Sequence, residues 1–237
     1  MPEATIPPPE TLLPEPESDE TYHNAIDFER INGDNIKKAA NRTQGTAGPS
    51  GVDAYAWRRF CSSFKSASVN LDNAMAGVAR RLCTTPVHPD GISAFLACRL
   101  LPLDKDPGVR PIGIGEVPRR IITKSILKVI GEDVKLGAGP LQTCARHEAG
   151  CEAAMHAMKE IEALEGTEAI LLVDATNTFN TINRQAALHN IKVVCPAMST
   201  VLNNTYTKPI RLLVSGGGEI SSMEGITQGD PLAMVTL

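Results

Sequence analysis

The sequence predicts an α+β protein, and three observations lead to this prediction. Residues 169–173 (AILLV) form a short, wholly apolar run, which is typical of a buried strand. Residues 99–115 (RLLPLDKDPGVRPIGIG) alternate in polarity as a β-hairpin does, with Asp-Pro-Gly at residues 106–108 as its turn. Amphipathic stretches with helical spacing lie on both sides of these segments. A chain of 237 residues is long enough to bury a substantial core around such elements.

Hydrophobic periodicity predicts most of the remaining elements. Helices are predicted at residues 53–64, 68–83, 92–98, 117–134, 148–164, 183–194 and 196–206. Asp90 is a predicted N-cap of the third, and Pro118 lies in the first turn of the fourth. A second hairpin is predicted over residues 209–222, with its turn at residues 215–218 (Ser-Gly-Gly-Gly).

Two of these helices carry large apolar side chains that are predicted to face inward. In the helix at 53–64 we expect the aromatic residues to be core rather than base-stacking surfaces. These are Tyr55, Trp57, Phe60 and Phe64. In the helix at 148–164 the predicted inward set is Ala153, Met155, Met158, Ile161 and Leu164.

The charge is distributed unevenly along the chain. The net charge is −4, but residues 31–147 hold seventeen basic and nine acidic residues, whereas the segments on both sides are acidic. This asymmetry is compatible with phosphate contact on one face. Residues 1–20 are rich in proline and acid, so they are predicted to be disordered. No apolar stretch approaches the roughly 20 residues of a membrane span, so no membrane partner is expected.

The six cysteines are predicted to be reduced thiols. None forms a C-x-x-C pair and no secretory signal begins the sequence, which favours an intracellular protein, nuclear or cytoplasmic, that is not secreted. Cys144, His147, Cys151 and His156 superficially resemble a zinc knuckle. Zinc is not favoured there, because the last two residues fall in a predicted helix instead of converging on one point.

Asp174 ends the apolar run at residues 169–173. A buried strand that releases a carboxylate at its C-terminal end is well suited to holding a hard cation, because the backbone is fixed and the charge is accessible. The alternative is an N-cap aspartate that merely ends a core strand.

A second segment favours the first interpretation. Residues 225–232 (GITQGDPL) resemble the Gly-x-x-Gln-Gly-x-Pro-Leu segment of the reverse-transcriptase palm, and Asp174 with Phe179 resembles that family's first catalytic aspartate and the aromatic five residues later. The turn at 47–51 and the hairpin at 99–115 resemble segments of the fingers in non-LTR-type members. The resemblance covers roughly residues 45–237, and it implies a right-hand polymerase fold.

The resemblance also implies roles for individual residues. Asp174 would be catalytic, and with the carbonyl of Ala175 it would ligate two Mg²⁺ (or Mn²⁺) ions. Residues expected at the incoming dNTP are Lys105, Arg110, Ala175, Phe179 (as a steric gate against the ribose 2′-hydroxyl), Gln228 and Gly229. Basic charges of the helix at 117–134 and a following fingers residue would face an RNA template paired with a DNA primer; these are Arg119, Arg120, Lys124 and Gln142. The alternative is that the charged residues of the hairpin and the helix form an ordinary solvated surface and bind no ligand. Asp230 is expected to favour a helix dipole rather than bind metal.

Three regions follow from this interpretation: a disordered acidic segment with a basic lead-in (1–45), a fingers-like region (46–168) and a partial palm (169–237). The family's aromatic-x-Asp-Asp hairpin would lie after the Gln-Gly segment, but no Asp-Asp pair occurs in the sequence. The expected function is therefore that of a fragment of a retroelement RNA-directed DNA polymerase, inactive as this chain. The alternative is a non-catalytic remnant that at most binds nucleic acid.

Overall fold

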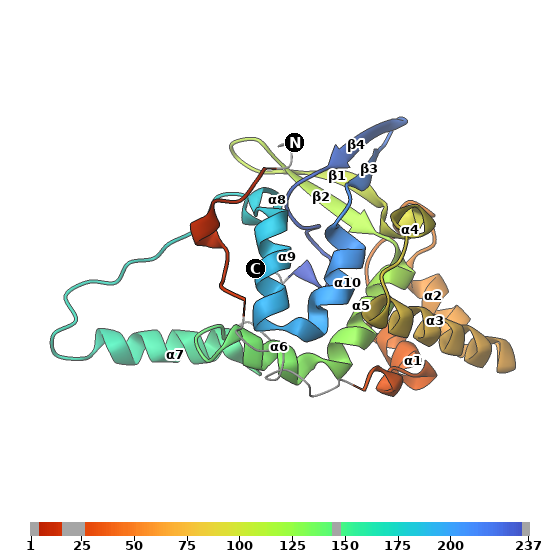
Figure 1. The fold of residues 1–237 in the computed structure, drawn as a ribbon, viewed down its shortest axis with the longest axis horizontal. Coiled ribbons are helices and arrows are strands. Elements are labelled where there is room, and N and C mark those ends of the chain that lie inside the picture. Colours follow the sequence, from red (N-terminus) through yellow and green to blue (C-terminus); the bar gives the residue numbers. More distant parts are fainter. Residues whose placement is uncertain (1–4, 16–26, 144–147, 234–237) are drawn as a thin grey trace.

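The computed structural model describes residues 5–15, 27–143 and 148–233. Within them the protein is a mixed α+β fold in which a small four-stranded sheet lies at one edge of a body of helices (Figure 1), so the predicted α+β class is confirmed. The helices are α1 (Gly33–Arg42), α2 (Ala54–Ser62), α3 (Ser66–Thr84), α4 (Pro89–Leu96), α5 (Val117–Val129), α6 (Gly131–Ala138), α7 (Gly150–Glu162), α8 (Thr178–Thr181), α9 (Arg184–Val194) and α10 (Pro196–Tyr206).

The sheet is built from the two predicted hairpins. Strands β1 (Cys98–Asp104) and β2 (Val109–Gly115) pair antiparallel, and so do β3 (Ile210–Val214) and β4 (Gly218–Ser222). A parallel pairing of β1 with β3 joins the hairpins, which gives the strand order β2-β1-β3-β4. The β1–β3 pairing places the first hairpin close to the segment that follows β4, where Thr227 lies near Gly113 of β2.

Helix boundaries follow local capping chemistry. Asp53 caps α2 through a 2.9 Å bond from the Ala56 N–H, and Asn183 caps α9 in the same way. The predicted N-cap role of Asp90 is wrong, because α4 begins one residue earlier at Pro89. The single helix predicted at 117–134 is divided at Ile130 into α5 and α6, where Gly131 weakens helix continuity.

The core lies where α1, α3, α5 and α10 pack against one another and against the inner strands. Its largest fully buried side chains include Ile31, Ile36, Ile121, Ile126, Ile130, Met198, Leu202, Tyr206 and Ile210. Four buried cysteines with free thiols belong to the same region, namely Cys61, Cys83, Cys98 and Cys195. Burial raises the pKa of the Cys83 thiol to about 12, so this thiol is protonated and unreactive at neutral pH.

The turn at residues 47–51 is tied to the beginning of α5. The Ser50 N–H and hydroxyl donate to the two carboxylate oxygens of Glu116 at 2.6 and 2.7 Å. A Cβ on Gly48 would lie 2.8 Å from the Glu116 backbone, so this close approach requires glycine.

The central strand predicted at residues 169–173 is not formed. These residues are extended but pair with no strand among the described residues, and Leu171, Leu172 and Val173 are each more than 80% exposed. An apolar run becomes a strand only where a partner edge and covering side chains are present. The described part of the chain supplies neither to residues 169–173.

Two predicted inward faces are also wrong. Met155, Ile161 and Leu164 are about half or more exposed, because α7 extends from the side of the fold (Figure 1). Of the four aromatic residues at 55–64, only Trp57 packs against the core, while Tyr55, Phe60 and Phe64 are 64, 40 and 49% exposed. The buried side of α2 is formed instead by Ala54 and Cys61, which lie two turns apart on one face.

Residues 5–15 differ from the predicted disorder. They contain a 3-10 turn at Pro9–Thr11 and lie along α9, joined to it by several hydrogen bonds. Residues 1–4 and 16–20, which the same prediction covers, lie outside the described residues. Among the helices that the structure describes, none combines the length and apolarity that a membrane crossing requires.

Asp72 of α3 gives the fold an expected pH dependence. Its side chain is buried, and its Oδ1 accepts no hydrogen bond from the described residues. Burial raises the pKa of Asp72, although contacts with Cys61 and Lys37 oppose the increase. A raised folded-state pKa means that the ionised carboxylate destabilises the fold, and this cost disappears as pH falls through that pKa to the ordinary value.

We therefore expect Asp72→Asn to raise the free energy of unfolding at pH 7 and to have almost no effect below pH 3.8, the ordinary pKa of the group. Urea unfolding at a series of pH values would measure this difference. The exposed carboxylate of Asp104, changed to Asn, is the control. A gain that is equal at all pH values would show that ionisation of Asp72 is not its cause.

Candidate functional site

A pocket of about 290 Å³ lies between the β1–β2 hairpin, the segment after the apolar run, and the turn that follows β4. Its lining contains six residues that the sequence singled out, from three segments far apart in the chain. The lining residues are Lys105, Arg110, Asp174, Ala175, Thr176, Asn177, Thr178, Phe179, Asn180 and Gln228. A larger hollow of about 600 Å³ between α4, α10 and β3 contains none of the predicted site residues.

Local hydrogen bonds fold the segment that carries Asp174 and Phe179. Asn177 adopts a left-handed conformation with φ of 54°, and its carbonyl accepts a 2.8 Å bond from the Asn180 N–H. The Thr178 hydroxyl donates to the carbonyl of Ala175 at 2.9 Å. The short helix α8 therefore begins at Thr178, four residues after Asp174, and its second residue, Phe179, lines the pocket.

A backbone seam joins this segment to the Gly-x-x-Gln-Gly segment. The Ile226 N–H donates to the Phe179 carbonyl at 2.6 Å, and the Gly225 N–H donates to the Ile182 carbonyl at 3.1 Å. Gly225 has φ of +74°, and a Cβ there would lie 2.5 Å from the Phe179 carbonyl oxygen. The first glycine of the motif is thus required for the approach that puts Phe179 and Gln228 in one pocket.

The pocket has a positive electrostatic balance. Lys105 and Arg110 extend from the exposed end of the hairpin, and neither makes an ion pair with any described carboxylate. The one carboxylate in the lining is that of Asp174, which is exposed. Two cations against one anion favour an anionic ligand, and the partly buried ring of Phe179 adds an apolar wall.

The donor set does not fit two divalent ions. Among the described residues no three His, Cys, Asp or Glu side chains are placed to hold a metal. Asp174 offers one carboxylate, and the Ala175 carbonyl already accepts the Thr178 hydroxyl. Mg²⁺ in proteins is usually held by one or two carboxylates, with waters and substrate phosphates completing its octahedron, so one carboxylate suits one ion but not two. The zinc alternative rests partly on Cys144 and His147, which lie outside the described residues.

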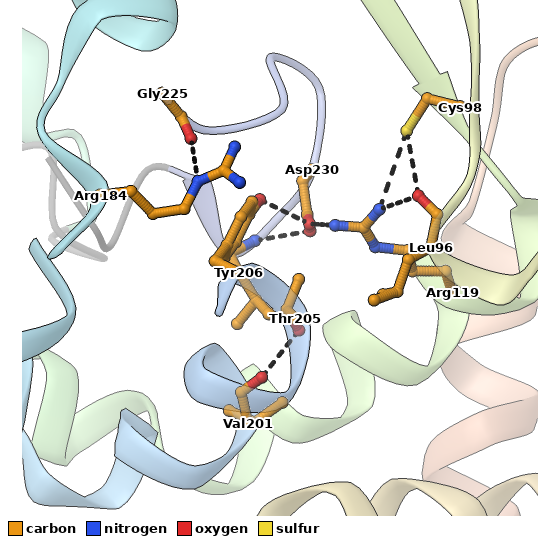
Figure 2. A network of polar contacts seen from close by, with 10 residues as sticks. Leu96, Cys98, Arg119, Arg184, Val201, Thr205, Tyr206, Gly225 and Asp230 are labelled. Carbon is orange, nitrogen blue, oxygen red and sulfur yellow. Dashed lines mark hydrogen bonds and ion pairs between the residues drawn. The ribbon is translucent and has the colours of Figure 1, made fainter. Parts of the chain in front are cut away.

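Arg119, a predicted template contact, is instead a core residue. Its guanidinium is 3% exposed and forms an ion pair with Asp230, as Figure 2 shows. The same guanidinium donates to the Leu96 carbonyl at 3.0 Å, and the Tyr206 hydroxyl donates to the same carboxylate at 3.0 Å. Burial disfavours the charged guanidinium, but the pairing with Asp230 outweighs it and raises the pKa of Arg119. Asp230 thus fixes the Gln-Gly turn to α5, and its Oδ1 also accepts the Leu232 N–H at 3.0 Å.

The two other predicted template contacts of α5 bind the protein's own backbone. Arg120 donates to the carbonyls of Gln44 and Thr46, and Lys124 Nζ lies 3.4 Å from the carbonyl of Arg42. Burial lowers the pKa of both side chains. Their hydrogen bonds hold residues 42–46 against α5. Arg120 and Lys124, predicted to contact a template, therefore make contacts within the protein.

The remaining predicted residues lie outside the pocket lining. Gln142 is exposed in the segment between α6 and α7. Gly229 has φ of +94° and lets the chain turn between Gln228 and the buried Asp230.

Arg184 is a structural residue of the site that the sequence did not single out. It is buried in the first turn of α9 and donates to the carbonyls of Ser222, Glu224 and Gly225 (Figure 2 shows the last of these). Its guanidinium also lies 5.5 Å from the centre of the Tyr206 ring, and that of Arg119 lies 6.0 Å from it. Only one local signal existed, a lone arginine just after the N-cap of an otherwise amphipathic helix.

No protein-family model matches this chain, and no curated protein is detectably similar to it. The assignment of a function therefore rests on the residues of the pocket and on their geometry.

Proposed function

We propose that the pocket binds the incoming deoxynucleoside triphosphate of a retroelement RNA-directed DNA polymerase, and that the chain is the fingers and part of the palm of such an enzyme. One observation carries this proposal. Residues from the hairpin, from the Asp174–Phe179 segment and from the Gln-Gly turn line the same pocket, although up to 123 positions separate them, from Lys105 to Gln228.

The chemistry of the lining suits a nucleotide. Lys105 and Arg110 supply positive charge for the phosphates, and the guanidinium fork of Arg110 matches phosphate oxygens in pairs. Phe179 supplies a flat apolar surface beside the sugar, and Gln228 offers an amide donor and acceptor. The resemblance of these segments to the reverse-transcriptase palm implies the same distribution of roles.

Nucleotide binding, and not nucleotidyl transfer, is the activity we assign to this chain by itself. The described residues bring one carboxylate to the pocket, which does not hold two divalent ions. Primer extension with template, dNTPs and Mg²⁺ is therefore expected to be absent. The alternative, a remnant that binds only nucleic acid, is weakened because Arg119, Arg120 and Lys124 are used inside the fold.

The test is equilibrium binding of a fluorescent dNTP to the whole chain. Charge-assisted contacts contribute about 1.5–3 kcal/mol each, so Lys105→Ala with Arg110→Ala should weaken binding by more than about 100-fold. Lys128→Ala, which removes an exposed cation of α5 outside the pocket, is the matched control and should leave binding unchanged.

Two further readouts separate the alternatives. Phe179→Ala should narrow the preference for dNTP over rNTP, because in the proposed role the ring would exclude the 2′-hydroxyl. Binding of single-stranded RNA that is unaffected by the Lys105 and Arg110 changes, with no dNTP binding, would favour the remnant and contradict the proposal. A variant in which Arg119, Arg120 and Lys124 are all replaced would not report on nucleic-acid binding alone, because it also removes the buried ion pair between Arg119 and Asp230.

A further inference from the structure

Residues 5–15, here called the strap, dock on α9 in a specific manner. The strap is extended apart from its 3-10 turn and runs beside α9 (Figure 1). Most of its side chains are exposed, Ile6 at 89%, so apolar burial contributes little to the docking. What fixes the strap is a set of polar contacts from α9 and its surroundings.

Asn190 is the central contact. Its Oδ1 accepts from the Leu13 N–H at 2.9 Å, and its Nδ2 donates to the Thr11 carbonyl at 3.0 Å. The neighbouring His189 Nε2 lies 2.8 Å from the Leu13 carbonyl. A carboxamide that satisfies one N–H and one carbonyl recognises extended backbone, because it offers both a donor and an acceptor. Side-chain identity at these strap positions is therefore secondary.

The first residue of the strap contacts Glu224 and Asn183, which lie outside the pocket lining. The Thr5 N–H donates to one oxygen of Glu224 at 2.7 Å, and the Thr5 carbonyl accepts from Asn183 Nδ2 at 2.8 Å. The other oxygen of Glu224 accepts from the Arg184 N–H, and Asn183 is the N-cap of α9. Glu224 immediately precedes Gly225 and Ile226, whose N–H groups form the backbone seam, so Thr5 is hydrogen-bonded to the residue next to that seam.

The last residue of the strap adds charge complementarity. Lys192 Nζ lies 3.0 Å from the Glu15 carboxylate, and both side chains are 61% exposed. An exposed pair of this kind contributes little affinity, but it favours an acidic strap and sets its direction.

We propose that the surface formed by His189, Asn190 and Lys192 of α9, its N-cap Asn183 and Glu224 is a docking site for an extended, proline-containing acidic peptide, and that the strap occupies it reversibly in cis. Covalent linkage gives the strap an effective concentration on the order of millimolar, so contacts too weak for a free peptide suffice. This inference uses no nucleotide and stands apart from the proposed function.

Hydrogen exchange on the intact chain tests the docking. The Leu13 and Thr5 amides should exchange about tenfold or more slowly relative to the Ile6 amide, for which no described residue supplies a backbone or side-chain acceptor. Asn190→Ala should bring Leu13 to the unprotected rate. Asn203→Ala is the matched control, because Asn203 bonds only residues of α10 and its end, Ser199 and Thr207. An unprotected Leu13 amide in the unaltered chain would overturn the proposal.

A second variant tests whether the same docking site binds a separate peptide. Leu13→Pro removes the N–H that Asn190 binds and leaves α9 unchanged, and the extended conformation of Leu12 is compatible with a following proline. A synthetic peptide of residues 5–15 should then shift the NMR signals of the Asn190 carboxamide and His189 ring. It should bind the unaltered chain about tenfold or more weakly, because the strap competes.

The same peptide with Leu13→Pro should not bind, and Asn190→Ala added to the Leu13→Pro chain should abolish the shifts. Shifts that persist with either change would mean that the peptide binds elsewhere, and would contradict the proposed docking site. Absence of any shift in the Leu13→Pro chain would overturn it equally.

Discussion

Replacing Asp230 with alanine is expected to lower the free energy of unfolding by about 3–5 kcal/mol, because it leaves the Arg119 guanidinium charged and unpaired in the core. The Tyr206 hydroxyl loses its acceptor in the same change, and the Leu232 N–H loses a 3.0 Å bond to Oδ1. Guanidinium chloride unfolding followed by circular dichroism measures this loss. An arginine guanidinium keeps its proton at neutral pH because of its intrinsic basicity, so the side chain does not escape the penalty by becoming neutral.

A compensating variant separates the buried charge from the packing. Arg119→Met together with Asp230→Leu removes both charges, and replacing both partners of a buried pair by apolar groups costs far less than removing one. The double variant should therefore unfold closer to the unaltered chain than Asp230→Ala does. The exposed pair of Arg211 and Glu219 is the surface control, and Glu219→Ala should have no measurable effect on stability. Equal losses for Asp230→Ala and the double variant would show that the ion pair is not the stabilising feature.

Gly225→Ala is expected to separate the two halves of the pocket and to destabilise the fold by about 2–4 kcal/mol, since overpacking and a left-handed alanine both contribute. The added Cβ would lie 2.5 Å from the Phe179 carbonyl oxygen and 2.6 Å from the Asn180 carbonyl carbon. These are backbone atoms, so no side-chain rotation relieves the contact. The amides of Gly225 and Ile226, which donate across the seam, should lose protection from hydrogen exchange.

Gly51 provides the matched control for this change. Its φ of +76° is close to the +74° of Gly225, but a Cβ there meets nothing within 4 Å. Gly51→Ala should therefore cost only the conformational strain, about 1 kcal/mol, and leave the pocket intact. If Gly225→Ala and Gly51→Ala have equal effects, the steric approach to Phe179 is not what requires glycine at position 225.

The amino-acid sequence by itself determined the elements whose causes are local. Alternation and a turn at residues 106–108 specify the first hairpin, and periodicity with caps such as Asp53 and Asn183 specifies the helices. The pocket residues Lys105, Asp174 and Gln228 were also predictable, because short motifs carry them. The strand at 169–173 was not, since pairing depends on an edge and not on the apolar run itself.

Only the tertiary structure decided which charges serve the fold and which remain available to a ligand. Arg119 and Asp230 are 111 positions apart, and no local pattern in the sequence indicates that two such groups meet in the core. The strap shows the same limit, because its composition predicts disorder but the donors and acceptors that hold it belong to α9. Lys105 and Arg110 remain free of internal ion pairs among the described residues, and this is what leaves the pocket positive. The physical reason is that burial and pairing depend on distance in space, whereas residue type and periodicity report only on neighbours in the chain.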